Sequence, residues 1–244
     1  MAFVERRPDE KAAAIGLDLA YPPDLEGDEA ASPVTPWSVR PKAFGQFLCD
    51  IFDHWVRHDV GRIFVQHFDV TLASWMGMDP PLCVFSERCG TALAIEHDGS
   101  LYSCDHYVYP EYHLGNIAER SLLEMVASEQ QRKLGNDKAD SLPRFCLECD
   151  VLALCHGGCP KQRFMATPDG EPGLNYLCTG YRQFFHHSAP LMKAMAELLH
   201  TGRPASMVMK IVSEREHPGK VTSIAPNSAC PCGSGKKFKQ CCGR

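Results

Sequence analysis

The stretch Cys146-Leu-Glu-Cys149-Asp-Val-Leu-Ala-Leu-Cys155-His-Gly-Gly-Cys159 decides how this chain is read, because it places four cysteines within fourteen residues. A Cys-x2-Cys pair puts two thiolates on one turn, close enough to hold a single metal centre. The two cysteines that follow can reach the same centre or a neighbouring one. Residues 146–178 contain few periodic apolar residues, so we expect metal to organise their fold.

Composition narrows the class of protein further. The 244 residues include 13 cysteines and are 44% hydrophobic. The 25 basic and 30 acidic side chains argue against DNA binding. The sequence contains no run of about 18 apolar residues, so it does not predict a membrane span. The first residues lack the apolar stretch of a secretory signal, so we expect a cytoplasmic protein. In that reducing compartment, clustered cysteines indicate metal binding rather than disulfides.

Eight cysteines form the central set, and they do not by themselves identify the metal. Four thiolates suit both structural zinc and an iron–sulfur cluster, so spacing alone leaves both open. The set is Cys83, Cys89, Cys104, Cys146, Cys149, Cys155, Cys159 and Cys178. Cys49, further upstream, is expected to be an ordinary packed thiol.

Apolar periodicity and turn residues predict an α+β fold: a small irregular domain with a β-hairpin and flanking helices, followed by a tiny cysteine-bearing tail. The resemblances described below imply that the domain is an iron–sulfur domain and that the tail binds zinc. We expect helices at 41–58, at 118–134 (ended by Gly135) and at 181–200. The first helix should turn Phe44, Phe47, Leu48, Ile51, Phe52, Trp55 and Val56 inward. Residues 62–68 are expected to form a strand. Residues 92–96 and 101–104 should pair around the turn signal Asp98-Gly99.

The predicted organisation has five parts. Residues 1–36 resemble a remnant of an upstream domain or a linker, and 37–78 a helix–strand connection. Residues 79–202 form the iron–sulfur domain, 203–222 a linker and 223–244 the tail.

The wider cysteine pattern resembles the seven-cysteine SPASM signature of radical S-adenosylmethionine (SAM) enzymes. It runs Cys89-x9-Gly99-x4-Cys104, a gap, Cys146-x2-Cys149-x5-Cys155-x3-Cys159, a gap, and Cys178. Four segments are similar to anaerobic sulfatase-maturating enzymes: Phe64-Val-Gln-His-Phe-Asp-Val-Thr-Leu-Ala-Ser-Trp75, Cys83-Val-Phe-Ser-Glu-Arg-Cys89-Gly, His97-Asp-Gly-Ser-Leu-Tyr-Ser-Cys104-Asp-His and Leu114-Gly-Asn-Ile.

That resemblance implies two auxiliary [4Fe–4S] clusters with four cysteine ligands each. The first would take Cys83, Cys89, Cys104 and Cys159, and the second Cys146, Cys149, Cys155 and Cys178. Asp105 alone would be read as a turn or cap residue, but it occupies the position of the family's proposed base. The family oxidises a cysteine or serine of a sulfatase polypeptide to formylglycine. A 5′-deoxyadenosyl radical removes a Cβ hydrogen, the base takes the side-chain proton, and an auxiliary cluster accepts the electron.

The family's radical-generating Cys-x3-Cys-x2-Cys motif does not occur in this sequence. We therefore expect the carboxyl-terminal part of such an enzyme, from a truncated gene, a misplaced start or a split subunit. S-adenosylmethionine and a third [4Fe–4S] cluster would belong only to the missing half, which a separate barrel subunit could supply. Alone, the chain is expected to be inactive as an enzyme.

The tail Cys230-Pro-Cys232-Gly-Ser-Gly-Lys-Lys-Phe-Lys-Gln-Cys241-Cys242 resembles the SEC-C zinc motif. Its four thiolates are suited to a tetrahedral zinc site that supplies the folding energy of so short a module. Lys236, Lys237 and Lys239 form either a solvated turn or a surface that docks a protein partner or a ribosome.

Two other interpretations of the whole chain remain open. One is a non-catalytic adaptor with zinc in the central sites, and the other is an unstable relic.

Overall fold

The computed structural model describes residues 34–243 except 36, 91, 217–224 and 231, so the expected remnant at 1–33 lies outside the described residues. The described chain divides into two compact units. Unit 1 comprises the residues up to Gly45 and Leu82–Tyr181, and unit 2 comprises Gln46–Pro81 and the residues from Arg182 onward. The expected α+β class is confirmed by a mixture of helices and small antiparallel sheets.

Unit 1 contains a three-stranded antiparallel sheet in the order β1-β2-β3. Its strands are β1 (Ala94–Ile95), β2 (Ser100–Tyr102) and β3 (His113–Asn116). The expected hairpin is confirmed by the pairing of Ala94 with Tyr102 and Ile95 with Leu101. Strand β3, which follows the 3-10 turn Pro110–Tyr112, was not predicted because only four residues form it.

The hairpin turn explains why Asp-Gly stands there. Gly99 has φ +87°, a left-handed conformation that favours glycine. The Asp98 carboxylate accepts hydrogen bonds from the amide and hydroxyl of Ser100, both at 2.9 Å. Behind the sheet, Leu101 and Leu114 pack with Met125 in a small core.

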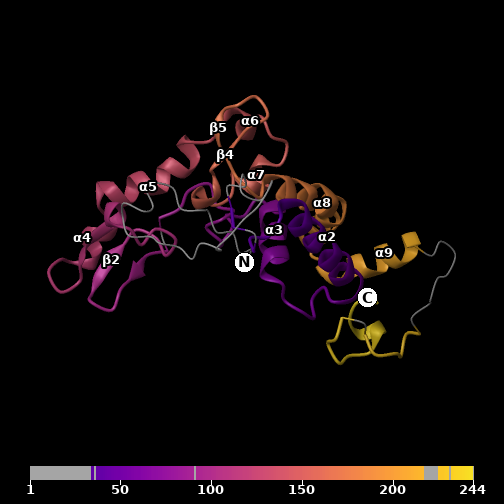
Figure 1. Ribbon diagram of the computed structural model, residues 1–244. Helices are drawn as coiled ribbons and strands as arrows, with labels where there is room; N and C mark the ends of the chain where they lie inside the picture. Colours follow the sequence, from indigo (N-terminus) through magenta and orange to yellow (C-terminus); the bar gives the residue numbers. More distant parts are fainter. Residues whose placement is uncertain (1–33, 36, 91, 217–224, 231, 244) are drawn as a thin grey trace. The chain divides into compact units, whose positions relative to one another are not determined.

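The expected single helix at 118–134 is wrong. The structure has two helices, α4 (Leu122–Val126) and α5 (Glu129–Asp140), drawn in Figure 1 beside β2. Ser128 begins α5 as its N-cap, accepting a hydrogen bond from the Gln131 amide at 3.2 Å. Gly135 does not end a helix but lies inside α5, where its missing side chain permits a close contact described below.

Short elements carry the cysteine-rich part of unit 1, as expected for a segment with few periodic apolar residues. They are α6 (Arg144–Leu147), α7 (Leu152–Cys155), the 3-10 turn η3 (Pro160–Gln162), and the hairpin of β4 (Met165–Ala166) and β5 (Pro172–Leu174).

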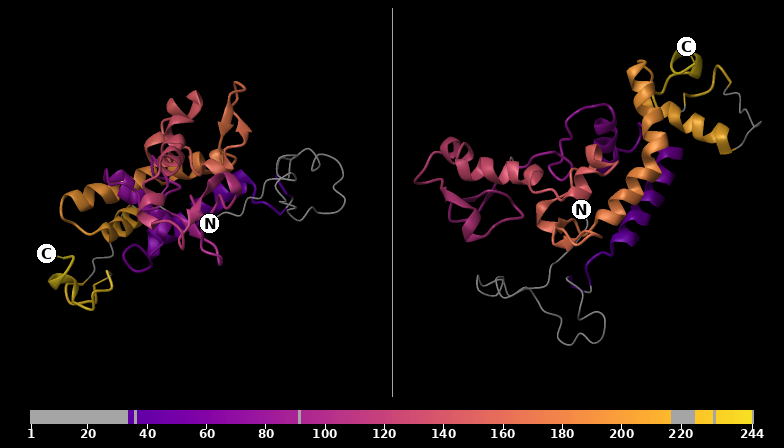
Figure 2. Two further views of the ribbon diagram at one scale, coloured as in Figure 1. Left: turned by 90° about the vertical axis from the view of Figure 1, so that its left-hand side faces the viewer. Right: turned by 90° about the horizontal axis from the view of Figure 1, so that it is seen from above.

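Two long helices, α2 (Pro41–His58) and α8 (Cys178–His200), each begin in unit 1 and continue into unit 2. Both were predicted, α8 with a start three residues later. In unit 2 they lie side by side in the same direction, since Gln46 contacts Gln183 at 3.0 Å and Asp53 contacts His187 at 2.7 Å (Figure 2).

The core of unit 2 is aromatic. Phe52 meets Phe68 and Phe184 edge to face, with ring centroids 5.4 and 6.0 Å apart. Phe47 and Ile51, expected to point inward, are exposed, so α2 buries a narrower stripe than predicted.

Two further expectations are wrong in unit 2. Residues 66–68, assigned to a strand, begin the helix α3 (Gln66–Trp75), whose start is held by a hydrogen bond from the Val65 amide to the Asp69 carboxylate at 3.1 Å. The expected linker at 203–222 contains the 3-10 turn η4 (Ala205–Met207) and the helix α9 (Val208–Glu216), with Val208 and Val212 buried. Its residues 217–222 lie outside the described residues.

The tail has almost no regular structure beyond one bridge between Ala229 and Lys237 and the 3-10 turn η5 (Phe238–Gln240). Among the helices that the structure describes, none is both long enough and apolar enough to cross a membrane.

Candidate metal centres

All eight central cysteines lie in unit 1, and none of the 13 cysteines forms a disulfide. They stand at element ends and in loops, where the chain can turn its thiols toward a common point. Cys104 comes two residues after β2, Cys159 directly precedes η3, and Cys178 is the first residue of α8.

One group of neighbouring thiols contains Cys83, Cys89, Cys104 and Cys159, called here the first quartet. Burial raises the pKa of Cys89, and the charges of Cys159 and Cys83 raise it further. Burial likewise raises the pKa of Cys104 to about 12, with a smaller contribution from Cys159. Cys159, the latest of the four in sequence, therefore interacts electrostatically with thiols from three earlier loops.

The other group, the second quartet, contains Cys146, Cys149, Cys155 and Cys178. Burial raises the pKa of Cys155 to about 12, and the charges of Cys178, Cys146 and Cys149 add to that shift. The resemblance implies the same two sets as cluster ligands, and that assignment stays a prediction. Thiols with raised pKa values are protonated at neutral pH, so a positively charged metal centre is required to make them thiolates.

The spacing of the thiols tests which metal fits. Four thiolates on one zinc ion lie about 3.8 Å apart, from tetrahedral geometry and a zinc–sulfur bond of about 2.3 Å. Within the described part of the chain, one group of three or more metal-ligating side chains has all its ligand atoms within 4.8 Å of one another, and that group is in the tail. Neither quartet offers three thiols that meet this limit.

Helix α5 supports the first quartet through one buried face that sequence reasoning missed. Gln131 donates to the backbone oxygens of Gly90 at 2.6 Å and Ser103 at 3.1 Å, the residues adjoining Cys89 and Cys104. One turn on, Gly135 accepts a hydrogen bond from the Cys89 amide at 3.3 Å. The next turn places Lys138 under the Cys83 loop. Gln131, Gly135 and Lys138 are spaced to share one face of a helix, and this spacing was the available signal for their contact with the cysteine loops. Because two of the three are polar, the sequence suggested an exposed face instead.

Arg163 supports the loop between Cys155 and Cys159. Its guanidinium donates to the backbone oxygens of His156 at 2.8 Å, Gly157 at 3.0 Å and Gly158 at 3.3 Å. That loop needs such support because its backbone turns through three successive left-handed residues.

Asp105 is exposed and follows the first quartet's Cys104 directly. The Cys104 thiol donates to the Asp105 carboxylate at 3.3 Å. His106, to which the sequence assigned no role, contacts two sulfurs: its amide donates to Cys104 Sγ at 3.4 Å, and its Nδ1 lies 3.3 Å from Cys159 Sγ. Asp105 therefore combines access from solvent with contact to the first quartet.

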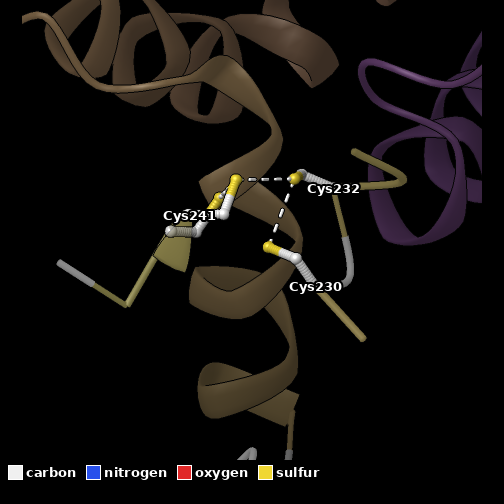
Figure 3. A group of neighbouring side chains, drawn as sticks. Cys230, Cys232 and Cys241 are labelled. Atoms are coloured by element: carbon white, nitrogen blue, oxygen red, sulfur yellow. Dashed lines mark hydrogen bonds between the residues drawn. The ribbon is translucent and has the colours of Figure 1, made fainter. Parts of the chain in front are cut away.

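The four tail cysteines form the compact group (Figure 3). Cys232 Sγ lies 3.2 Å from Cys230 Sγ and 3.4 Å from Cys241 Sγ, and the sulfurs of Cys241 and Cys242 are 3.9 Å apart. Hydrogen bonding, first from Ser234, lowers the pKa of Cys232 to about 6, which favours a thiolate at neutral pH. Both spacing and chemistry fit one tetrahedral zinc ion.

Comparison with protein families gives two matches. The SPASM family, described as an iron–sulfur cluster-binding domain, matches residues 83–150, and the SEC-C motif matches residues 227–244.

Curated relatives extend the similarity beyond these motifs. The chain is 52% identical over 190 residues to the serine-type anaerobic sulfatase-maturating enzyme of Bacteroides thetaiotaomicron, a match covering 78% of this chain and 45% of the relative. It is 30% identical over 166 residues to the cysteine-type enzyme of Clostridium novyi, covering 67% of this chain and 44% of the relative. The chain thus spans less than half the length of these relatives.

A solved structure shares the fold. Native anSMEcpe with bound AdoMet and Cp18Cys peptide superimposes with a TM-score of 0.60 at 27% identity, covering 72% of this chain and 47% of that one.

Proposed function

We propose that this chain, a homologue of the anaerobic sulfatase-maturating enzymes that carries a SPASM domain and a SEC-C motif, provides the auxiliary-cluster portion of a formylglycine-generating radical SAM oxidoreductase. The observation that carries the proposal is that all eight central cysteines lie in unit 1, where one face of α5 contacts the loops of Cys83, Cys89 and Cys104.

Each quartet would hold one [4Fe–4S] cluster: Cys83, Cys89, Cys104 and Cys159 the first, and Cys146, Cys149, Cys155 and Cys178 the second. Complete ligation by cysteine leaves no iron site open to substrate, which suits electron transfer. When bound, the first cluster would supply an acceptor for the electron released in the oxidation.

Asp105 would be the base that takes a proton from the side chain of the target cysteine or serine. Its carboxylate is exposed, so a sulfatase polypeptide can reach it, and its neighbour Cys104 belongs to the first quartet. Proton acceptance and electron acceptance would then occur side by side. A peptide is bound in the solved structure of anSMEcpe, which supports a polypeptide substrate here.

Radical generation would come from S-adenosylmethionine and a third cluster on a radical SAM barrel, joined to this region or supplied as a separate subunit. The lack of disulfides among the 13 cysteines supports the cytoplasm as the compartment in which the protein works. Zinc would be held by Cys230, Cys232, Cys241 and Cys242. Exposed Lys236, Lys237 and Lys239 would let the tail dock a protein partner or a ribosome.

Oxygen-free purification tests the proposal. We expect about eight iron and eight sulfide atoms per chain in the central domain, as two [4Fe–4S] clusters require, and a Mössbauer spectrum of cubane iron. The variant Cys49→Ala, which removes a buried thiol of α2 outside both quartets, should keep all of that iron. Colourless protein with zinc in the central sites would instead support a non-catalytic zinc adaptor.

A further inference from the structure

Lys138 is a fully buried lysine at the first quartet. Its side chain has 0% exposure, and its ammonium donates to the backbone oxygens of Cys83, Ser86 and Val84, the last at 3.2 Å. An ammonium has three protons to donate, so these three acceptors satisfy it completely. The loop that starts at Cys83 is therefore fixed around one positive charge.

That charge has no carboxylate partner among the residues that the structure describes, since its acceptors are neutral carbonyl groups. A buried charge is costly unless an opposite charge compensates it. Lys138 contacts Cys83 of the first quartet directly, and Gly135, one turn earlier in α5, contacts Cys89 of the same quartet, so thiolates bound to a cluster there would supply the opposite charge.

We propose that Lys138 is a positioning residue of the first cluster, whose buried positive charge compensates the anionic cluster and raises its reduction potential relative to the second. The proposal rests on the ligand sets of the proposed function. A four-thiolate cubane carries net negative charge, and reduction adds one more. A nearby fixed cation stabilises the reduced state more than the oxidised one.

The effect is specific to one cluster. The Lys138 ammonium contacts the loop that starts at Cys83 of the first quartet, whereas the Arg163 guanidinium contacts the loop between Cys155 of the second quartet and Cys159 of the first. Lys138 therefore separates the potentials of the two clusters. That separation favours electron acceptance at the cluster beside Asp105.

The test is a reductive titration of the full chain under anaerobic conditions, followed by electron paramagnetic resonance. In Lys138→Met the potential of the first cluster should fall and that of the second should stay unchanged. Lys138→Arg, which keeps the charge, should restore the first potential toward the original value. The variant Cys178→Ala, which removes one thiol of the second quartet, identifies which signal belongs to which cluster.

Two control variants separate charge from loop support. Gln131→Leu removes a neutral anchor of the same quartet on the same face of α5, and it should lower the potential of the first cluster less than Lys138→Met does. Lys133→Met removes an exposed lysine of α5 that pairs with Asp137, and solvent should screen its loss.

Each outcome decides the matter. Equal potentials in Lys138→Met and the unsubstituted chain, or an equal fall in Gln131→Leu, would overturn the inference while leaving the proposed function intact. If Lys138→Met does not assemble the first cluster, the iron content of Lys138→Arg decides. A normal iron content in Lys138→Arg supports the role of the charge, and loss of the first cluster in Lys138→Arg as well overturns the inference. Absence of cubane iron from the unsubstituted chain would overturn the proposed function and this inference with it.

Discussion

Gly135 and Cys89 touch so closely that a Cβ atom on the glycine would lie 2.5 Å from the Cys89 carbonyl oxygen. Real Cβ atoms essentially never come that near, and the obstructing atom belongs to a backbone that cannot rotate away. Only glycine lets α5 pack on this loop, so the residue that weakens the helix also positions Cys89, a proposed cluster ligand.

Gly135→Ala should therefore destabilise unit 1, by about 1–3 kcal/mol as for other overpacked sites. The sign of the change in stability is informative, because a Gly→Ala substitution at an open helical position stabilises a protein by about 1 kcal/mol. Thermal unfolding and iron content would measure the effect, with the first cluster expected to be lost more readily. Asn136→Ala places the same residue at the next, exposed position of α5 and should be neutral or slightly stabilising.

Asp105→Asn should leave iron and sulfide content normal and lower turnover by about 10²–10⁴-fold, the usual contribution of a general base. The assay requires this region together with a radical SAM barrel, and formylglycine is measured by mass spectrometry on cysteine and serine peptides. Asp150→Asn is the matched control, because Asp150 follows Cys149 of the second quartet as Asp105 follows Cys104, with its carboxylate 3.8 Å from the thiol. Normal turnover in Asp105→Asn would remove the residue from the chemistry.

His67 should make unit 2 sensitive to acid. Burial lowers the pKa of its imidazole from 6.5 to about 4, so between these values the unfolded chain binds a proton that the folded chain does not. The stability is fully present above pH 6.5 and declines as the pH falls toward 4, by about 3 kcal/mol in total.

Urea unfolding followed by tryptophan fluorescence measures this, since Trp55 and Trp75 both lie in unit 2. His67→Phe should abolish most of the change between pH 7.5 and pH 5. His54→Gln alters a histidine whose side chain is 71% exposed and should not affect it. Identical pH profiles for His67→Phe and the unsubstituted chain would assign the acid sensitivity to another group.

Cys232→Ser should remove zinc from the tail, because Cys232 lies nearest to two of the other three sulfurs. Loss of about one zinc per chain by elemental analysis is expected, with the iron of unit 1 retained. Cys49→Ala, which changes a thiol outside every candidate site, should keep the zinc. Full zinc content in Cys232→Ser would exclude the tail as the zinc site.

Local signals in the sequence were sufficient for several elements. The hairpin follows from Asp98-Gly99, and the long helices predicted at 41–58 and 181–200 follow from apolar periodicity and the proline at position 41, although the second begins at Cys178. The strand assigned at 62–68 and the linker assigned at 203–222 failed, because short helices with few buried residues give weak periodicity.

The prediction of one helix at 118–134 in place of α4 and α5 failed for a different reason. The buried face of α5 consists of Gln131, Gly135 and Lys138, which in sequence look like a polar surface, a helix end and a solvated charge. Their burial depends on carbonyl groups of loops that are 28 to 55 residues away along the chain.

The sequence by itself determined which chemical groups this protein can offer, because residue type and spacing are local and covalent. It offers twelve thiols in clustered groups, a carboxylate after one of them, and a short tail whose four sulfurs can share an ion. The tertiary structure decided which thiols meet. It brings Cys159 to three distant loops, and it encloses one lysine among them. These contacts depend on packing between segments that are remote in the sequence, which no local sequence pattern specifies.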